Sequence, residues 1–409
     1  MPEPEPGPPE PPAAQTSSPV EGESQPTAVP VNTPTPALES GCPIPPGSPP
    51  LPDLDAEFGW GASLQEYLNQ GGLVEPLAAA LQSTPAPDGN RAAVSRRDLT
   101  GDGLEDLAVT LYGAEQGSTR PSGSLLIFRC DKDRYRLAYS TTPSQNVGPP
   151  VLMSVKDLNG DGLVELLYWR ETCGAHTCFK QVEILRWERS GFVGLFEGRS
   201  DDLPSPKIEI TGPLNDGRYQ IEITAEGIAS AGAGPYRPFT RTWQWSPERS
   251  KFISVKEQLA PPTYRIHLLH DADDAASAGN LEAALIMYQR VREDGPLDDW
   301  IKGQDGYTQL AAFATYRQMT LHLQLGRTAM AEQALQFLQE SVPEGSTAYG
   351  IRSLAEAYWE AYLETGELEA ACAAARRFAQ QQPADVLEPL QYGYANRSYT
   401  PAEVCPPTG

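Results

Sequence analysis

Two similar stretches decide how this sequence is interpreted: DLTGDGLEDLAVTLY at residues 98–112 and DLNGDGLVELLYW at residues 157–169. In each, oxygen-bearing side chains alternate with other residues in a short loop that runs into an apolar segment. Calcium binds six to eight oxygen ligands, and a tight loop can supply them from alternate positions. We therefore predict two calcium loops. Their ligands at positions 1, 3, 5, 7 and 9 are Asp98, Thr100, Asp102, the Leu104 carbonyl and Asp106 in the first loop, and Asp157, Asn159, Asp161, the Leu163 carbonyl and Glu165 in the second.

The same loops have a simpler interpretation, in which Asp and Asn side chains only cap the turns by accepting hydrogen bonds from nearby backbone amides. An EF-hand is not expected, because each loop leads into a strand pattern and not into a helix. The repeated D-x-[TN]-G-D-G pattern resembles the FG-GAP or VCBS-type repeat of integrin-like β-propellers and bacterial surface proteins, over roughly residues 92 to 190. The resemblance implies calcium binding and one propeller blade per repeat. Since two repeats cannot close a propeller, we expect a partial, propeller-like β domain.

The rest of the chain divides by composition. Residues 1–52 hold 18 of the 40 prolines and no aromatic or basic residue, so we expect a disordered tether there. The pattern of residues 53–90 predicts short helices that pack on the β domain. We assign residues 91–260 to the β domain, because short runs of β-branched and aromatic residues alternate there with turn clusters. Helical periodicity follows over residues 261–390, and residues 391–409 are predicted to form an irregular tail.

Three segments of the helical part share one pattern. Each begins with a glycine that joins two helices, and an alanine follows five residues later where helices must approach closely: Gly279 and Ala284, Gly326 and Ala331, Gly366 and Ala371. The pattern resembles the second helix of tetratricopeptide repeats, which form an α-solenoid. The resemblance implies an inner groove that binds a protein or peptide partner through first-helix residues, namely Leu269, Asp273, Phe313, Tyr316, Glu356 and Glu360. The alternative is that the repeats only buttress the β domain.

The six cysteines are scattered in a way that suits disulfides better than a zinc site. Cys173 and Cys178 flank a short loop between two strand-like runs, and a Cys372–Cys405 bridge would staple the tail. Cys42 and Cys130 are then left for each other, although six cysteines allow 15 connectivities. Disulfides imply an oxidising compartment. We expect an extracytoplasmic protein, secreted or held at the cell surface by a lipid anchor upstream of the given N-terminus.

The net charge of −23 argues against nucleic acid or an anionic membrane surface as a partner, because both need clustered lysine or arginine. No apolar run is long enough to span a membrane. His267, His270 and Asp271 share a helical face that could ligate zinc, but packing is the commoner role, and no G-x-S-x-G marks a nucleophilic serine. We therefore expect a non-enzymatic, calcium-binding interaction or scaffolding protein. The alternative is a secreted hydrolase, acting on glycans or dependent on a metal.

Overall fold

The computed structural model of the chain describes most residues from Ser40 onward, namely 40–53, 60–83, 93–113, 122–142, 147–228, 230, 232–293, 295–301 and 304–405. The tether predicted for residues 1–52 lies outside the described residues as far as residue 39. The described part contains both β-sheets and helices, as the sequence predicts. None of its helices combines the length and the apolar character that crossing a membrane requires.

Three four-stranded antiparallel sheets follow one another within the described residues, and each is a meander with its strands in chain order. The first sheet consists of β1 (Val94–Arg97), β2 (Asp106–Gly113), β3 (Ser122–Asp131) and β4 (Arg134–Ser140). The second consists of β5 (Val151–Lys156), β6 (Glu165–Cys173), β7 (Cys178–Glu188) and β8 (Gly191–Gly194). The third consists of β9 (Pro206–Thr211), β10 (Gln220–Ala225), β11 (Phe239–Ser246) and β12 (Lys251–Leu259).

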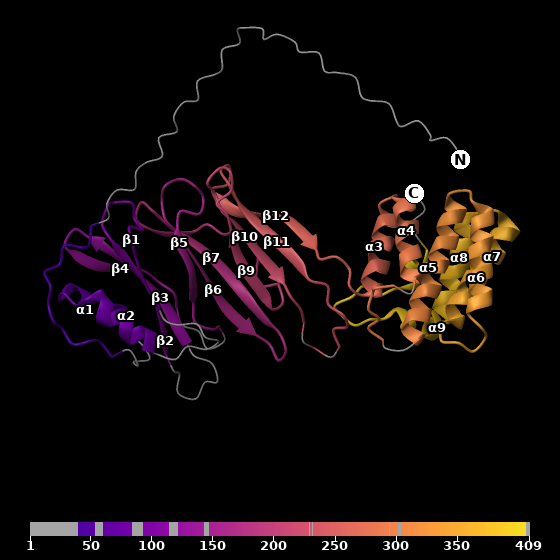
Figure 1. Ribbon diagram of the computed structural model, residues 1–409, viewed down its shortest axis with the longest axis horizontal. Helices are drawn as coiled ribbons and strands as arrows, with labels where there is room; N and C mark the ends of the chain where they lie inside the picture. The colour runs from indigo at the N-terminus through magenta and orange to yellow at the C-terminus, as the bar shows by residue number, and fades with distance from the viewer. Residues whose placement is uncertain are drawn as a thin grey trace, which may run out of the picture. The chain divides into compact units, whose positions relative to one another are not determined.

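The sheets stack face to face because the middle sheet is apolar on both sides (Figure 1). Successive side chains of a strand point to opposite faces. On β6, Leu166 and Tyr168 therefore share a core with Leu125 of the first sheet, whereas Leu167 shares a core with Ile221 of the third. The uninterrupted apolar run LLYW thus reflects a strand that is covered on both faces.

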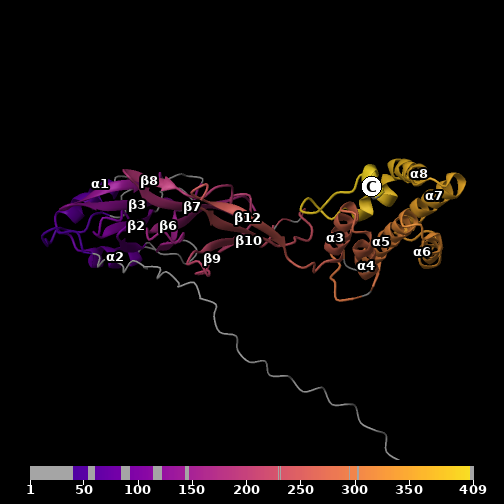
Figure 2. The same cartoon turned by 90° about the horizontal axis from the view of Figure 1, so that it is seen from above.

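The outer faces of the first and third sheets, at the two ends of the stack, are covered differently (Figure 2). Helices α1 (Trp60–Asn69) and α2 (Val74–Ser83) cover the outer face of the first sheet, where Leu64 and Leu77 join the core that contains Leu107. On β10 of the third sheet, Ile221 and Ile223 face inward and are fully buried, whereas Glu222 and its neighbours on the other face are polar. The three sheets therefore form an open row.

The helical part consists of consecutive helices that pack in pairs: α3 (Arg265–Ser277) with α4 (Leu281–Arg292), α5 (Gln304–Gln324) with α6 (Thr328–Ser341), and α7 (Tyr349–Thr365) with α8 (Leu368–Gln381). Each pair is joined at one of the predicted glycines, which have φ angles of 71° to 78° that suit glycine (Gly279, Gly326 and Gly366). The three predicted alanines, Ala284, Ala331 and Ala371, are fully buried where the helices meet. The short helices α9 (Pro383–Val386), η2 (Glu388–Leu390) and η3 (Pro401–Val404) follow.

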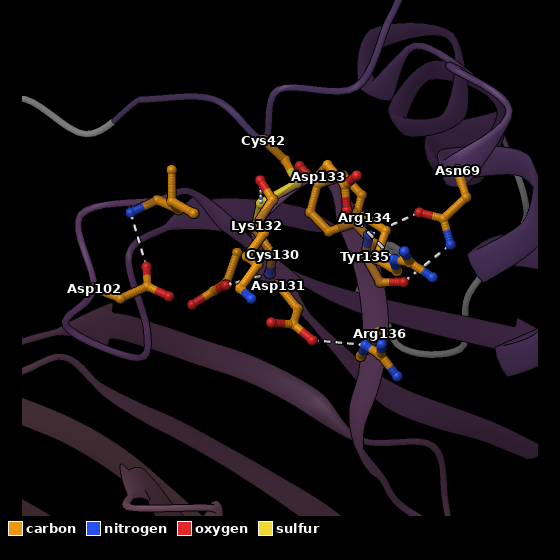
Figure 3. The surroundings of a disulfide bond; sticks show 12 residues. Cys42, Asn69, Asp102, Cys130, Asp131, Lys132, Asp133, Arg134, Tyr135 and Arg136 are labelled. Carbon is orange, nitrogen blue, oxygen red and sulfur yellow. Dashed lines mark hydrogen bonds and ion pairs between the residues drawn. A yellow bond between two sulfur atoms is a disulfide. The ribbon is translucent and has the colours of Figure 1, made fainter.

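All three predicted disulfides are confirmed: Cys42–Cys130, Cys173–Cys178 and Cys372–Cys405. Cys173 and Cys178 are cross-strand partners at the end of β6 and β7, so their bond closes that hairpin. Cys42–Cys130 joins two residues that are 88 positions apart and fixes the N-terminal segment to β3 (Figure 3). Three bridges are consistent with folding in an oxidising compartment.

Candidate functional site

The two D-x-x-G-D-G loops occupy the same place in their sheets, the first between β1 and β2 and the second between β5 and β6. At position 1, Asp98 accepts hydrogen bonds from the amides of Gly101 (2.7 Å), Asp102 (3.2 Å) and Gly103 (2.7 Å). Asp157 does the same for the amides of Gly160 (2.7 Å) and Gly162 (2.8 Å). These bonds fold both loops into the same turn.

Position 5 lies at the surface of each loop, and position 9 lies in the interior. Asp102 and Asp161 are exposed, and each accepts a hydrogen bond of 2.9 Å from the amide two residues later, that of Leu104 or Leu163. Asp106 and Glu165, in contrast, are fully buried. The predicted ligands thus range from exposed at position 5 to fully buried at position 9.

The buried position-9 acids are unfavourable places for a negative charge. Asp106 accepts hydrogen bonds from the amides of Leu99 (2.9 Å), Thr100 (3.0 Å) and Cys130 (2.7 Å), but burial raises its pKa to about 6. Burial raises the pKa of Glu165 to about 8, and the nearby carboxylates of Asp161 and Asp157 contribute to the rise. A cation in the loop would offset this penalty, because an opposite charge favours the ionised carboxyl.

The second loop differs from the first in the contacts of Asn159 and Arg186. The Asn159 side-chain amide donates to Asp161 (3.1 Å) and to Glu165 (2.9 Å), which bridges positions 5 and 9. The Arg186 guanidinium pairs with Asp161 at 2.8 Å. Because this arginine already neutralises part of the loop's charge, a cation would gain less there than a fully unpaired set of acids would provide.

In the geometry described, both loops are amide-capped turns, the simpler of the two interpretations. Three ligating Asp, Glu, His or Cys atoms approach one another within 4.8 Å at Glu171, Cys173 and Cys178, and at no other group among the described residues. The two sulfurs there are joined in a disulfide. A carboxylate has about four lone-pair positions, so amide capping still leaves Asp98 and Asp157 acceptor capacity for an ion.

The first loop also meets the N-terminal segment. The Ser40 amide donates to the Gly103 carbonyl (3.2 Å), and the Glu105 amide donates to the Ser40 carbonyl (2.9 Å). Two residues later Cys42 is bonded to Cys130, whose own amide donates to Asp106. Figure 3 shows this disulfide near Asp102. The first of the described residues are therefore held beside the first loop.

In the helical part, four of the six predicted groove residues lie together but are not accessible. Leu269, Phe313 and Tyr316 are fully buried, and Asp273 is 6% exposed. The chain's own C-terminal segment contacts Asp273, Phe313 and Tyr316, and partner binding by these residues remains a prediction. The other two residues lie apart on α7, where Glu356 is bonded to Arg352 (2.9 Å) and Glu360 is exposed.

The covering segment, residues 397–405, is held by side chains of α3, α5 and α8. The Tyr399 hydroxyl donates to Asp273 (2.5 Å), and its ring packs on Phe313 with a centroid distance of 5.2 Å. The Arg317 guanidinium donates to the carbonyls of Glu403 (2.5 Å) and Val404 (2.9 Å). The segment ends at Cys405, in the disulfide to Cys372 of α8.

A buried charge cluster lies under this segment and lines a pocket of ≈ 270 Å³. Asp273 accepts hydrogen bonds from both Tyr288 and Tyr399, each at 2.5 Å, and pairs with Arg317 at 3.3 Å. Burial and the Asp273 charge raise the pKa of both tyrosines well above the usual value. Burial alone would lower the pKa of Arg317, but Asp273 and the surrounding tyrosines raise it. The sequence alone did not identify Tyr288, Arg317 and Tyr399 as site residues. The predicted Cys372–Cys405 disulfide was the sequence feature that could have placed the tail beside them.

The three residues considered for zinc do not converge. His267 Nε2 lies 3.2 Å from the Pro235 carbonyl, and Asp271 pairs with both terminal nitrogens of Arg237, at 2.5 and 3.0 Å. His270 packs against Tyr399 with a centroid distance of 6.1 Å. Their positions correspond to packing and ion pairing.

Comparison with known protein families, with curated proteins and with solved structures found no match to this chain.

Proposed function

We propose that this chain is an extracytoplasmic interaction protein, in which calcium stiffens the β domain and the helical repeats bind a protein partner through their inner groove. In this proposal the sheet stack is a partial, propeller-like scaffold and the helix pairs are tetratricopeptide-like. The observation that carries the proposal is the position of residues 397–405, because this short segment, with one turn of 3-10 helix at Pro401–Val404, lies on the face that such repeats use.

The partner role is supported by the chemistry of that face. Arg317 binds main-chain carbonyls, which every peptide offers, whereas Asp273 and Phe313 together fit one aromatic hydroxyl side chain. Main-chain recognition combined with one or two side-chain pockets is a common way to bind extended peptides.

The calcium role is supported by the buried acids at position 9. Asp106 and Glu165 are placed where their charged forms are disfavoured, in loops whose position-5 acids are exposed. Calcium is a hard cation that prefers carboxylate and carbonyl oxygens, and in both loops it would offset the cost of burying these charged carboxylates. The three disulfides support an oxidising location, where millimolar calcium sites can be occupied.

Partner capture tests the proposal. The chain carrying Cys405→Ser, which removes the disulfide that holds the covering segment in place, is immobilised in calcium buffer, incubated with the envelope and secreted fractions of its source, cross-linked and analysed by quantitative mass spectrometry. It is compared with a groove-rim variant that adds Arg376→Glu and with a matched variant on the β domain that adds Lys207→Glu. Each added substitution replaces a positive side chain of an exposed ion pair by a negative one, so the two variants have the same net charge.

The expected result is a protein that is enriched by the Cys405→Ser chain and by the β-domain variant, but not by the groove-rim variant. If the same proteins are recovered with all three chains, the groove does not bind a partner and the proposal is wrong.

A further inference from the structure

Residues 397–405 lie on the helical part as a ligand lies on a receptor, with only every few side chains inserted. Tyr399, Val404 and Cys405 are buried, whereas Ser398, Thr400, Ala402 and Glu403 face solvent. Tyr399, Val404 and Cys405 join the hydrophobic core of the helical part, and residues Pro401–Val404 form the 3-10 helix η3. The segment is therefore a short peptide with one helical turn, held at two anchor points.

The first anchor is the Tyr399 side chain. Its hydroxyl meets the Asp273 carboxylate and its ring meets the Phe313 ring, so it fills a site with both a polar and an aromatic wall. Asp273 is itself held by Tyr288 and Arg317. The acceptor is therefore already in position before the ligand tyrosine arrives, which lowers the entropic cost of binding.

The second anchor is the main chain around Val404. Arg317 donates to the Glu403 and Val404 carbonyls, and the Val404 side chain is fully buried. Between the anchors the segment forms hydrogen bonds within itself. The Glu403 carboxylate accepts hydrogen bonds from the Thr400 amide (2.9 Å) and hydroxyl (2.7 Å). These bonds form one turn that sets the distance between the tyrosine and the valine.

We propose that residues 397–405 are a built-in ligand of the repeat groove, and that the groove takes from its partner a peptide of the same chemistry: a tyrosine followed five positions later by a small aliphatic residue. This inference rests on the proposed function and specifies its ligand and its control. The Cys372–Cys405 disulfide holds the segment in place, so the oxidised chain keeps its own groove filled.

The attached segment competes with a free peptide for the groove, and the tether determines how strongly. A short tether gives the attached segment an effective concentration on the order of 1 mM. If a free peptide of the same sequence binds an empty groove with a Kd of ~10 μM, the unlatched segment weakens its apparent binding by about 100-fold. The disulfide makes the segment's occupancy essentially complete.

The experiment uses the full chain in three forms: wild type, Cys405→Ser, and a tail-out variant that combines Cys405→Ser, Tyr399→Ala and Val404→Asp. The probe is a fluorescent synthetic peptide of residues 396–405 with serine in place of Cys405, and binding is followed by fluorescence anisotropy. The tail-out variant is expected to bind the probe, Cys405→Ser to bind about 100-fold more weakly, and the wild type not to bind. A control probe with Tyr399→Phe is expected to bind the tail-out variant at least about tenfold more weakly.

A tail-out variant that keeps its helical circular dichroism and binds no probe at ~1 mM overturns the inference. Should that variant unfold, hydrogen exchange of Cys405→Ser decides: residues 398–405 are expected to lose protection about 100-fold or more while α5 keeps it. Equal protection of the two segments would show that the tail is part of the core. The probe needs no external partner, so partner capture without probe binding refutes this inference alone.

Discussion

At the scale of single residues, the buried charge cluster of the helical part is centred on Asp273. It is a nearly buried carboxylate that accepts two phenol hydrogen bonds and pairs with Arg317, which is itself 4% exposed. Removing one partner of a buried ion pair leaves the other charge uncompensated, which costs about 3 to 5 kcal/mol. A substitution here therefore affects the helix pairs and the seat of Tyr399 together.

Asp273→Asn is accordingly expected to lower the free energy of unfolding by about 3 kcal/mol, since Arg317 keeps its charge but loses its counter-ion. The matched control is Asp274→Asn. The neighbouring Asp274 also pairs with an arginine, Arg397, but it is 60% exposed, so its loss is expected to cost less than about 1 kcal/mol. Urea unfolding followed by circular dichroism measures both values. Similar losses for the two variants would contradict the assignment of Asp273 as the structural centre.

His270 predicts a pH dependence of the helical part. Burial lowers its pKa from 6.5 to about 4, with Arg397 and His267 adding to the effect and Asp273 and Asp274 opposing it. Between pH 6.5 and 4 the unfolded state binds more protons than the folded state, so stability falls as the pH falls through this window. At about 1.4 kcal/mol per pKa unit, the full loss is on the order of 3 kcal/mol near pH 4.

His270→Gln is expected to flatten this decline, because glutamine does not titrate. His176→Gln, at the exposed tip of the Cys173–Cys178 hairpin, is the control and should leave it unchanged. Urea unfolding of the three chains at pH 7 and pH 4.5 gives the comparison. Parallel pH profiles for wild type and His270→Gln would show that His270 does not drive the loss.

At the scale of elements, each loop turns on a glycine at the position after its second aspartate. Gly103 and Gly162 have φ angles of 86° and 87°, and a Cβ at either position would meet no atom within 4 Å. A substitution to alanine therefore adds no clash, and its cost is the backbone strain of the left-handed conformation. That strain is about 1 to 2 kcal/mol per residue.

Gly103→Ala and Gly162→Ala are each expected to destabilise the β domain by about 1 to 2 kcal/mol. Gly191→Ala is the matched control, because a Cβ there also meets nothing and no positive φ angle is required. Thermal unfolding of the three variants separates strain from packing. The expectation fails if Gly191→Ala costs as much as the loop substitutions.

Some features of these elements could be predicted from the sequence alone, and others could not. The loop glycines, the helix-joining glycines, the buried alanines and all three cysteine pairs could be predicted, because each depends on local spacing or on few alternatives. The seat of the tail could not, since its bonds are long-range: Tyr399 and Asp273 are 126 residues apart. The tail has no periodicity, so only its cysteine indicated where it would lie. The tail is bonded to α3, α5 and α8, whereas the predicted groove residues Glu356 and Glu360 belong to α7.

At the scale of the whole molecule, we propose that calcium acts on one part of the chain and that another part binds the partner. The two predicted calcium loops belong to the first two sheets, whereas the corresponding connection of the third sheet carries the single acid Asp216, whose carboxylate caps the Arg218 amide at 3.1 Å. Calcium is therefore expected to stabilise the first two sheets and to leave the helices unaffected. An ion at 100 times its dissociation constant adds about 2.7 kcal/mol per site.

The most direct test is thermal unfolding of the full chain in millimolar calcium and in chelator, followed segment by segment with pulsed hydrogen exchange. We predict that calcium raises the unfolding temperature of residues 94–194 by several degrees and leaves that of residues 265–405 unchanged. Asp102→Ala and Asp161→Ala should each reduce the shift, whereas Asp216→Ala, at a capped turn of the same kind, should not. If chelator leaves the unfolding of residues 94–194 unchanged, the two loops are capped turns and the calcium assignment is wrong.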